Sequence, residues 1–288
     1  MREVIQGLLE GAVEIHVHGA PDVIPRKRSD DELAQEATKA HMKGLVLKCH
    51  HALTSDRAFL LKRCFPGLEI FGGVVLNNAS TGGFNPVAVE AALKLGAKII
   101  WMPTLSARNS KIAKGQTVGR SLEEKVFDHP LSILDDRDQV LPDVHTILEL
   151  IAWSEAILAT GHLSVGESSV LIKEAIGKGV KRIVVNHPES RLIRMSVDEQ
   201  MALRREGVYF ERCYVSHLLG IPFEVIVEAI KHVGVETTIL ATDLGQVNNP
   251  SPVDGLGQYL ERLLRSGISE KDLATMVKTN PAEVLGIR

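Results

Sequence analysis

The stretch Glu14-Ile15-His16-Val17-His18-Gly19 closes a short apolar run near the N-terminus and carries a His-x-His pair. Three later apolar runs close in the same way, with the segments Thr160-Gly161-His162, Asn186-His187-Pro188 and Thr242-Asp243-Leu244-Gly245. Each of the four runs is strand-like, and each ends in a residue type that binds metal ions. Together they predict a metal site at one rim of a parallel β-barrel, where the carboxyl ends of the strands converge.

Strand-like runs recur along the whole chain, with amphipathic segments between them. Eight of them are rich in β-branched residues: Ala12–His18, Gly44–His50, Leu68–Leu76, Lys98–Pro103, Ala156–Gly161, Arg182–Asn186, Val208–Tyr214 and Thr237–Thr242. They are continuously apolar rather than alternating, which is typical of strands buried on both faces of a parallel sheet. Eight β-then-α units predict an α/β protein with a (β/α)8 TIM-barrel fold, and residues 1–288 are expected to form one domain.

One interval is about twice as long as the others, between the fourth and fifth predicted strands. It contains residues 105–141, which we interpret as an insertion after strand four that forms a lid over the active face. A solvated loop without such a role is the alternative. The end of this segment, residues 132–141, has the pattern of a small hairpin.

Composition excludes several classes of protein. The formal net charge of −3 comes without any basic stripe, so nucleic acid is not an expected partner. No run of about 18 apolar residues occurs, so no membrane segment is expected. Three cysteines are too few, and odd in number, for a disulfide framework, which favours a cytoplasmic location. The expected partner is a small-molecule substrate, and a homo-oligomer is compatible with the sequence.

Strand geometry explains why the histidines form one site. Residues two apart in a strand point to the same side, so His16 and His18 face one way and Val17 the other. Zinc binds imidazole nitrogens at about 2.0–2.1 Å and usually takes three or four protein ligands. His162, His187 and Asp243 end later strands and should meet the first pair at the same rim. We therefore predict these five residues as metal ligands.

This set of residues resembles that of the amidohydrolase superfamily of metal-dependent hydrolases. The matching positions are the His16–His18 pair on strand one, His162 on strand five, His187 on strand six and Asp243 on strand eight. The C-terminal segment Thr279-Asn280-Pro281-Ala282-Glu283-Val284-Leu285-Gly286 is also similar to the Asn-Pro-Ala-x-x-Leu-Gly signature of many members. The resemblance covers essentially the whole chain. It implies one or two divalent metals, a metal-activated water as nucleophile, and Asp243 as the catalytic residue that handles its proton.

The sequence departs from the superfamily pattern on strand four. Two-metal members commonly supply a bridging carboxylated lysine there, but this strand ends Ile100-Trp101-Met102-Pro103-Thr104. Strand two instead ends Leu47-Lys48-Cys49-His50-His51. A buried lysine needs a partner or a lowered pKa. We predict Lys48 as the bridging metal ligand, with Cys49 or His50 as substitutes; if none of them bridges, the site holds one metal.

Three residues are candidates for binding substrate. His50 shares a strand face with Lys48. Glu211 and Arg212 interrupt the apolar seventh strand, and one of the two should face the barrel mouth, where it could bind a polar or acidic group. Which of them does so stays open at this point.

These observations favour a metal-dependent hydrolase acting on an amide, cyclic imide, lactone or related ester of a small molecule. One alternative is a Schiff-base lyase with Lys48 as the amine nucleophile. Others are a metal-dependent isomerase or decarboxylase of the same superfamily, and a barrel that binds a metabolite without catalysis. Histidine-rich ligation favours zinc, while manganese, iron or nickel would also suit a mixed His/Asp site.

Overall fold

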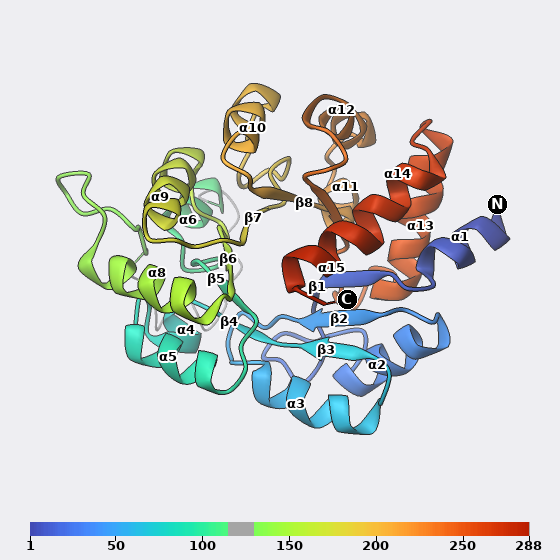
Figure 1. The fold of residues 1–288 in the computed structure, drawn as a ribbon, viewed down its shortest axis with the longest axis horizontal. Helices are drawn as coiled ribbons and strands as arrows, with labels where there is room; N and C mark the ends of the chain where they lie inside the picture. Colours follow the sequence, from blue (N-terminus) through green and yellow to red (C-terminus); the bar gives the residue numbers. More distant parts are fainter. Residues whose placement is uncertain (115–129, 288) are drawn as a thin grey trace.

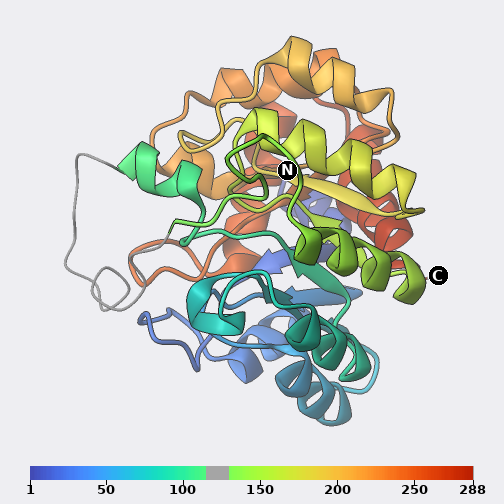
Figure 2. The same ribbon diagram turned by 90° about the vertical axis from the view of Figure 1, so that its left-hand side faces the viewer.

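The computed structural model describes residues 1–114 and 130–287, and it shows strands inside and helices outside (Figures 1 and 2). All strand pairs in this part of the chain are parallel. The strands are β1 (Val13–Val17), β2 (Gly44–Leu47), β3 (Glu69–Phe71), β4 (Gly73–Val75), β5 (Ile99–Trp101), β6 (Ile157–Ala159), β7 (Ile183–Asn186), β8 (Tyr209–Cys213) and β9 (Thr238–Ala241). Each lies within one of the eight predicted runs, which confirms the predicted parallel α/β fold.

The third predicted run is divided into β3 and β4 at Gly72. A Cβ at Gly72 would lie 2.4 Å from the carbonyl oxygen of Thr54, so the loop backbone approaches the chain too closely for any other residue. The Thr54 hydroxyl accepts a hydrogen bond from the Gly73 N–H at 2.9 Å and donates one to the Leu47 carbonyl at 2.7 Å. Thr54 thus makes the hydrogen bonds that a neighbouring strand would make at this point. As a result, β2 pairs with β3 but not with β4.

The strands form two sheets, with orders β1-β2-β3 and β4-β5-β6-β7-β8-β9. Beyond β9, Leu244 forms an isolated parallel bridge to Val17, and its carbonyl accepts a 2.8 Å hydrogen bond from the His18 N–H. The Asp243 N–H donates to the His16 carbonyl at 3.0 Å. The first and last strands therefore meet at their carboxyl ends. The fold is of TIM-barrel type, but the predicted closed eight-stranded barrel is not formed by continuous pairing.

Helices follow the strands in turn. They are α1 (Arg2–Leu9), α2 (Asp30–Lys39), α3 (Ser55–Cys64), α4 (Asn78–Thr81), α5 (Pro86–Lys94), α6 (Arg108–Lys114), α8 (Pro142–Ser154), α9 (Val165–Gly177), α10 (Val197–Arg204), α11 (Tyr214–Leu218), α12 (Phe223–Val233), α13 (Pro252–Arg265), α14 (Glu270–Ala274), the π-helix η1 (Thr275–Thr279) and α15 (Asn280–Leu285). Capping boxes begin α2, α9 and α10, where a serine and a glutamate three residues later satisfy the first N–H groups. None of the helices in the described residues is long and apolar enough to cross a bilayer.

The predicted insertion is described only in part. Helix α6 and residues 130–141 lie between β5 and β6, as expected. The predicted small hairpin is present as an antiparallel bridge between Leu134 and Val140, with a 2.9 Å bond from the Asp135 N–H to the Gln139 carbonyl. The part of the proposed lid at 115–129 lies outside the described residues, so the lid stays a prediction.

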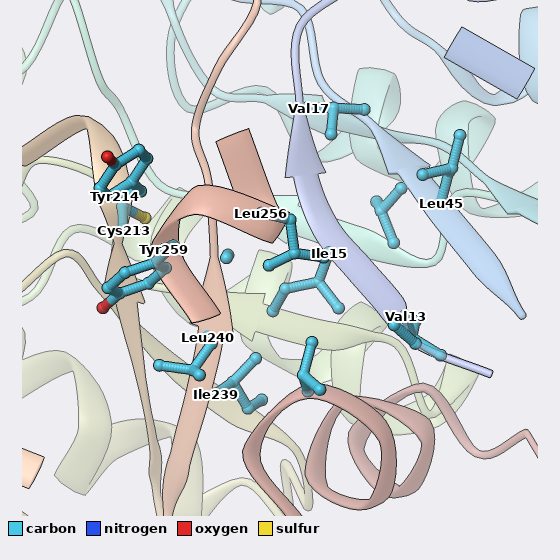
Figure 3. Close-up of a cluster of buried hydrophobic side chains, with 14 of the residues drawn as sticks. Val13, Ile15, Val17, Leu45, Cys213, Tyr214, Ile239, Leu240, Leu256 and Tyr259 are labelled. Carbon is cyan, nitrogen blue, oxygen red and sulfur yellow. The ribbon is translucent and has the colours of Figure 1, made fainter. Parts of the chain in front are cut away.

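The alternation of side chains along β1 separates the core from the site. Val13, Ile15 and Val17 are buried, and Figure 3 shows Ile15 beside Leu256 of α13 within this cluster. The intervening Glu14 and His16 point to the opposite face. The strand β1 thus directs apolar side chains towards the helices, and polar side chains towards the inner side of the sheet.

Candidate metal centre

Three of the predicted ligands meet at the carboxyl ends of β1 and β9. Asp243 Oδ1 lies 3.0 Å from His16 Nε2 and 3.1 Å from His18 Nε2. The His16 and His18 side chains are 0% and 1% exposed, whereas Asp243 keeps 17% of its side-chain exposure. We call these three residues the triad. Among the three side chains, only the Asp243 carboxylate is therefore accessible to solvent or to a substrate.

The donor set of the triad fits a divalent cation. Its three ligand atoms lie within 4.8 Å of one another. In a tetrahedral site with bonds of about 2.0–2.1 Å, neighbouring ligand atoms lie about 3.3 Å apart, close to the separations from Asp243 to the two rings. Two imidazole nitrogens and a carboxylate oxygen are also a donor combination that zinc and other first-row divalent metals accept.

The backbone at this rim is fixed by an unusually close approach. Gly245 has φ +144°, and a Cβ there would lie 1.9 Å from the His18 carbonyl oxygen. Asp243 itself has φ +52°, in the left-handed region that few non-glycine residues adopt. The chain thus turns sharply after β9, and this turn directs the Asp243 carboxylate towards β1.

The charges in the triad are set by the contact between Asp243 and the two imidazoles. Burial raises the pKa of the Asp243 carboxyl, but the charge of His16 and hydrogen bonds from His16 and His18 outweigh it and hold that pKa well below its usual range. Burial lowers the pKa of His16, but Asp243 and Glu211 overcome this and raise it to about 9. Burial lowers the pKa of His18 to about 3. At neutral pH the site without metal therefore holds an ionised Asp243, a protonated His16 and a neutral His18, and an ion bound at His16 Nε2 would displace the proton there.

His162 and His187 form a second pair beside the triad. Their ring centroids lie 4.9 Å apart, and the His187 ring lies 6.3 Å from that of His16. His162 Nδ1 lies 2.9 Å from Ser110 Oγ, and His187 Nδ1 lies 3.3 Å from Ser190 Oγ. Burial lowers the pKa of His187 to about 4, so this ring is neutral. The five predicted ligands are thus brought to one rim, but as a triad and an adjoining pair.

Lys48 lies directly beside the triad. Its Nζ is 3.0 Å from His16 Nε2 and 5.4 Å from the centre of the Trp101 ring. The side chain is buried, and burial lowers the pKa of the amine. This residue, which directly follows β2, thus contacts the His16 member of the triad.

The two proposed substitutes for Lys48 differ in position. His50 lies at the same rim, with its ring 4.8 Å from that of His18 and its Nδ1 2.8 Å from Thr104 Oγ1. Burial holds the pKa of His50 well below its usual range. Cys49 points to the other side of the strand, where it groups with Asp22 and His51. None of the candidate ligand groups among the described residues joins Cys49 to the triad, so its bridging role stays a prediction.

Glu211 and Arg212 lie on opposite faces of β8, and the structure decides between them. Glu211 faces inward and contacts the His16 ring. Arg212 faces outward, is 0% exposed, and pairs with Glu189 and with Gln200 Oε1 at 2.9 Å. Its guanidinium is held between β8 and the outer helices, so the tentative assignment of Arg212 to substrate binding is withdrawn. Glu211 is also fully buried beneath His16 rather than at the mouth, which argues against direct substrate contact.

Arg26 is a neighbour of the triad that the sequence did not indicate. Its guanidinium lies 3.3 Å from His18 Nδ1 and pairs with Asp22 at 2.7 Å. Asp22 also lies 3.2 Å from His51 Nδ1. These residues belong to the loop after β1 and to the end of β2. The available signal was their position just after strand ends, where loops build the active face of such folds.

Several solved structures share the fold of this chain. An amidohydrolase from Pseudomonas aeruginosa is 13% identical, with a TM-score of 0.63 over 99% of this chain and 97% of that chain. A lactonase from Listeria monocytogenes is 11% identical, with a TM-score of 0.62 over 97% and 96%. A dihydroxybenzoic acid decarboxylase from Polaromonas, solved with bound manganese, is 11% identical, with a TM-score of 0.60 over 96% and 97%. At such low identity the likeness shows a shared fold and confirms the predicted TIM-barrel type of architecture.

Sequence comparison identifies the family. No curated protein matches the chain. Residues 11–211 match a family of unknown function, DUF6282. The matched span includes His16, His18, Lys48, His162 and His187, and ends before Asp243. Because it covers well over half of the 288 residues, the chain belongs to the DUF6282 family.

Proposed function

We propose that this protein is a metal-dependent hydrolase of small molecules. The observation that carries the proposal is the convergence of His16 Nε2 and His18 Nε2 on Asp243 Oδ1, at 3.0 and 3.1 Å, at the carboxyl ends of the strands. Buried polar groups are unfavourable unless they are paired, and they seldom gather in this way without a function. Zinc is the favoured ion for this ligand set, and manganese is supported by the bound metal in the related decarboxylase fold.

Each residue has a distinct role in this proposal. His16, His18 and Asp243 would hold the ion, and the His162–His187 pair would hold a second ion or orient the substrate. When bound, a divalent ion lowers the pKa of water and polarises a substrate carbonyl. Asp243 is ionised and is the exposed member of the triad, so its carboxylate can accept a proton from the attacking water. The same carboxylate then returns this proton to the leaving group.

The proposed substrate is an amide, cyclic imide, lactone or related ester. Support comes from the fold shared with a lactonase and an amidohydrolase. The His50 ring is neutral and borders the triad, where it could bind a polar group of such a substrate.

Decarboxylation is a second candidate, because a dihydroxybenzoic acid decarboxylase shares the fold over nearly the whole length of both chains. The two reactions differ in their products. Hydrolysis consumes water and gives two fragments or a ring-opened acid, whereas decarboxylation releases CO₂. A panel of lactones, cyclic imides and hydroxybenzoates, analysed by mass spectrometry and for released CO₂, separates them.

Lys48 supports a third candidate, a Schiff-base lyase. Its buried amine has a lowered pKa, which favours the neutral, nucleophilic form. Borohydride in the presence of a carbonyl substrate would trap the lysine covalently in a lyase and would leave a hydrolase unmodified. A protein that binds a metabolite without catalysis would give neither trapped adduct nor product.

The decisive experiment is elemental analysis of protein purified without chelators. We expect one or two equivalents of a divalent transition metal per chain. In the His16→Ala/His18→Ala double variant the metal should be lost while circular dichroism stays that of a folded α/β protein. Wild-type protein without metal, even after incubation with excess zinc or manganese, would refute the proposal.

A further inference from the structure

A chain of buried hydrogen bonds runs beneath the triad, from β6 to the ring of His16. The Gly161 N–H donates to Asn186 Oδ1 at 2.8 Å, and Asn186 Nδ2 donates to Glu211 Oε2 at 2.5 Å. The same carboxylate oxygen lies 3.1 Å from His16 Nδ1. Three neighbouring strands thus place one acceptor oxygen against the ring nitrogen that faces away from Asp243.

The direction of each bond in this chain is determined by its donors and acceptors. The Gly161 N–H can only donate, so the oxygen of the Asn186 amide faces it and the NH₂ group faces Glu211. The Asn186 NH₂ group donates to Glu211 Oε2, so this oxygen acts as an acceptor. The same oxygen faces His16 Nδ1 at 3.1 Å, and a hydrogen bond forms between them when Nδ1 carries a proton.

The Cys213 sulfur also lies near His16 Nδ1, at 3.9 Å, but the Glu211 oxygen is closer, at 3.1 Å. With Nδ1 bonded to Glu211, Nε2 is the ring nitrogen left to bind an ion once its own proton is displaced, and it points to Asp243. The side chains involved are nearly or fully buried, at 0% exposure for His16 and 1% for Asn186 and Glu211, so water does not replace these contacts.

We propose that Glu211 is a positioning residue, held by Asn186, which fixes the ring orientation and tautomer of His16 so that Nε2 is presented to the cation of the proposed centre. This inference rests on the proposed metal-dependent function and adds to it a residue that does not touch the metal or the substrate. A carboxylate bonded to a ligating histidine also increases the basicity of that ligand, and loss of such partners typically weakens metal binding by about 10–100-fold.

The chain contains a matched control, because a second buried glutamate also contacts His16. Glu14 Oε1 accepts a hydrogen bond from the backbone N–H of His16 at 3.0 Å and does not contact the ring. Glu14→Gln therefore changes a buried glutamate beside His16 without touching the ring, whereas Glu211→Gln changes the acceptor that faces His16 Nδ1.

The test is a zinc affinity measurement on metal-free wild type, Glu211→Gln and Glu14→Gln, by competition with a chromophoric chelator at about pH 7. We expect the dissociation constant to rise by about 10–100-fold in Glu211→Gln and by less than about threefold in Glu14→Gln. Circular dichroism reports the folded fraction, so affinities are compared per folded molecule. A Glu211→Gln affinity equal to that of wild type, or an equal loss in both variants, would overturn the inference.

A second measurement does not depend on any variant being folded. In zinc-loaded wild type with ¹⁵N-labelled histidine, we expect the NMR signal of His16 to show a protonated Nδ1 and a metal-bound Nε2. A protonated Nε2 would overturn the positioning role while leaving a metal centre intact. Wild type that binds no zinc would refute the proposed function and this inference together, so the two failures can be told apart.

Discussion

Glu14 should make the stability of this protein fall as the pH rises, and Glu14→Gln should remove that dependence. The carboxyl is fully buried, and its Oε2 has no hydrogen-bond partner among the described residues. Burial raises its pKa from an ordinary 4.5 to about 8, against the smaller effect of the bond from the His16 N–H. In the unfolded chain the group ionises near its ordinary value, so over this interval the folded state binds more protons than the unfolded state.

The magnitude follows from the two pKa values. Stability falls by about 1.4 kcal/mol per pH unit wherever the folded state holds one extra proton. The contribution is most favourable below the unfolded pKa of 4.5 and is progressively lost up to the folded pKa of about 8. Between about pH 5 and about pH 7.5, wild type should therefore lose about 3 kcal/mol relative to Glu14→Gln, which has no titrating group at this position.

The assay is urea unfolding followed by circular dichroism, at several pH values, on the metal-free forms of both proteins. Subtracting the two free energies of unfolding at each pH removes the contribution of the other titrating groups. The change of this difference with pH then also removes any constant difference between a carboxyl and an amide. Glu211→Gln provides the opposite case, because the pKa of Glu211 is lowered in the folded protein. The ionised Glu211 of wild type stabilises the fold above pH 4.5, and this stabilisation is lost in acid. Wild-type and Glu14→Gln curves that stay parallel from about pH 5 to about pH 7.5 would refute the assigned pKa.

Three further predictions concern the site itself. Lys48→Ala should lower the metal content from about two ions to one or fewer if Lys48 bridges two metals, and unchanged stoichiometry by elemental analysis would reject that role. Asp243→Asn should reduce turnover by about 10²–10⁴-fold without unfolding the protein, while the exposed His232→Ala control stays at the wild-type rate; near-normal turnover of Asp243→Asn would place the proton elsewhere. Gly245→Ala should destabilise the fold by about 2 kcal/mol or more, because its Cβ would meet a carbonyl oxygen at 1.9 Å. Gly267→Ala, also at positive φ but with nothing within 4 Å, should cost less in thermal unfolding, and equal effects would contradict the role of the close approach.

The parallel strands and the rim position of the ligands could be predicted because both depend on local patterns. Continuous apolar runs marked each strand, and a polar residue at the end of a run marked its carboxyl end. The division of the third run at Gly72 could not be predicted, because it depends on Thr54, which is distant in sequence and packs its backbone against that glycine. An interrupted ladder of this kind leaves no trace in the periodicity of the strand itself.

The choice between Glu211 and Arg212 shows a second limit of sequence reasoning. Adjacent residues in a strand point to opposite faces, so one of the pair had to face inward, but a strand buried on both faces gives no apolar alternation to reveal which. In the structure the register of β8 against β7 pairs Glu211 with Asn186, and this places the carboxylate towards His16. The inward direction of Glu211 therefore depends on how β1, β7 and β8 are arranged in space, which the sequence of β8 alone does not show.

Two strand-end residues of the site also have a backbone conformation that stability alone would not favour. His187 and Asp243 have φ +28° and +52°, where a non-glycine residue costs on the order of 1–3 kcal/mol. Histidine, aspartate and asparagine tolerate this region better than most residues. In the proposed centre, a metal ligand and proton acceptor at the end of a strand must turn back over the rim, and these residue types can do so while supplying a donor atom. Asparagine at position 243 keeps the same backbone tolerance, and the expected loss of turnover in Asp243→Asn can therefore be attributed to the carboxylate rather than to the turn that holds it.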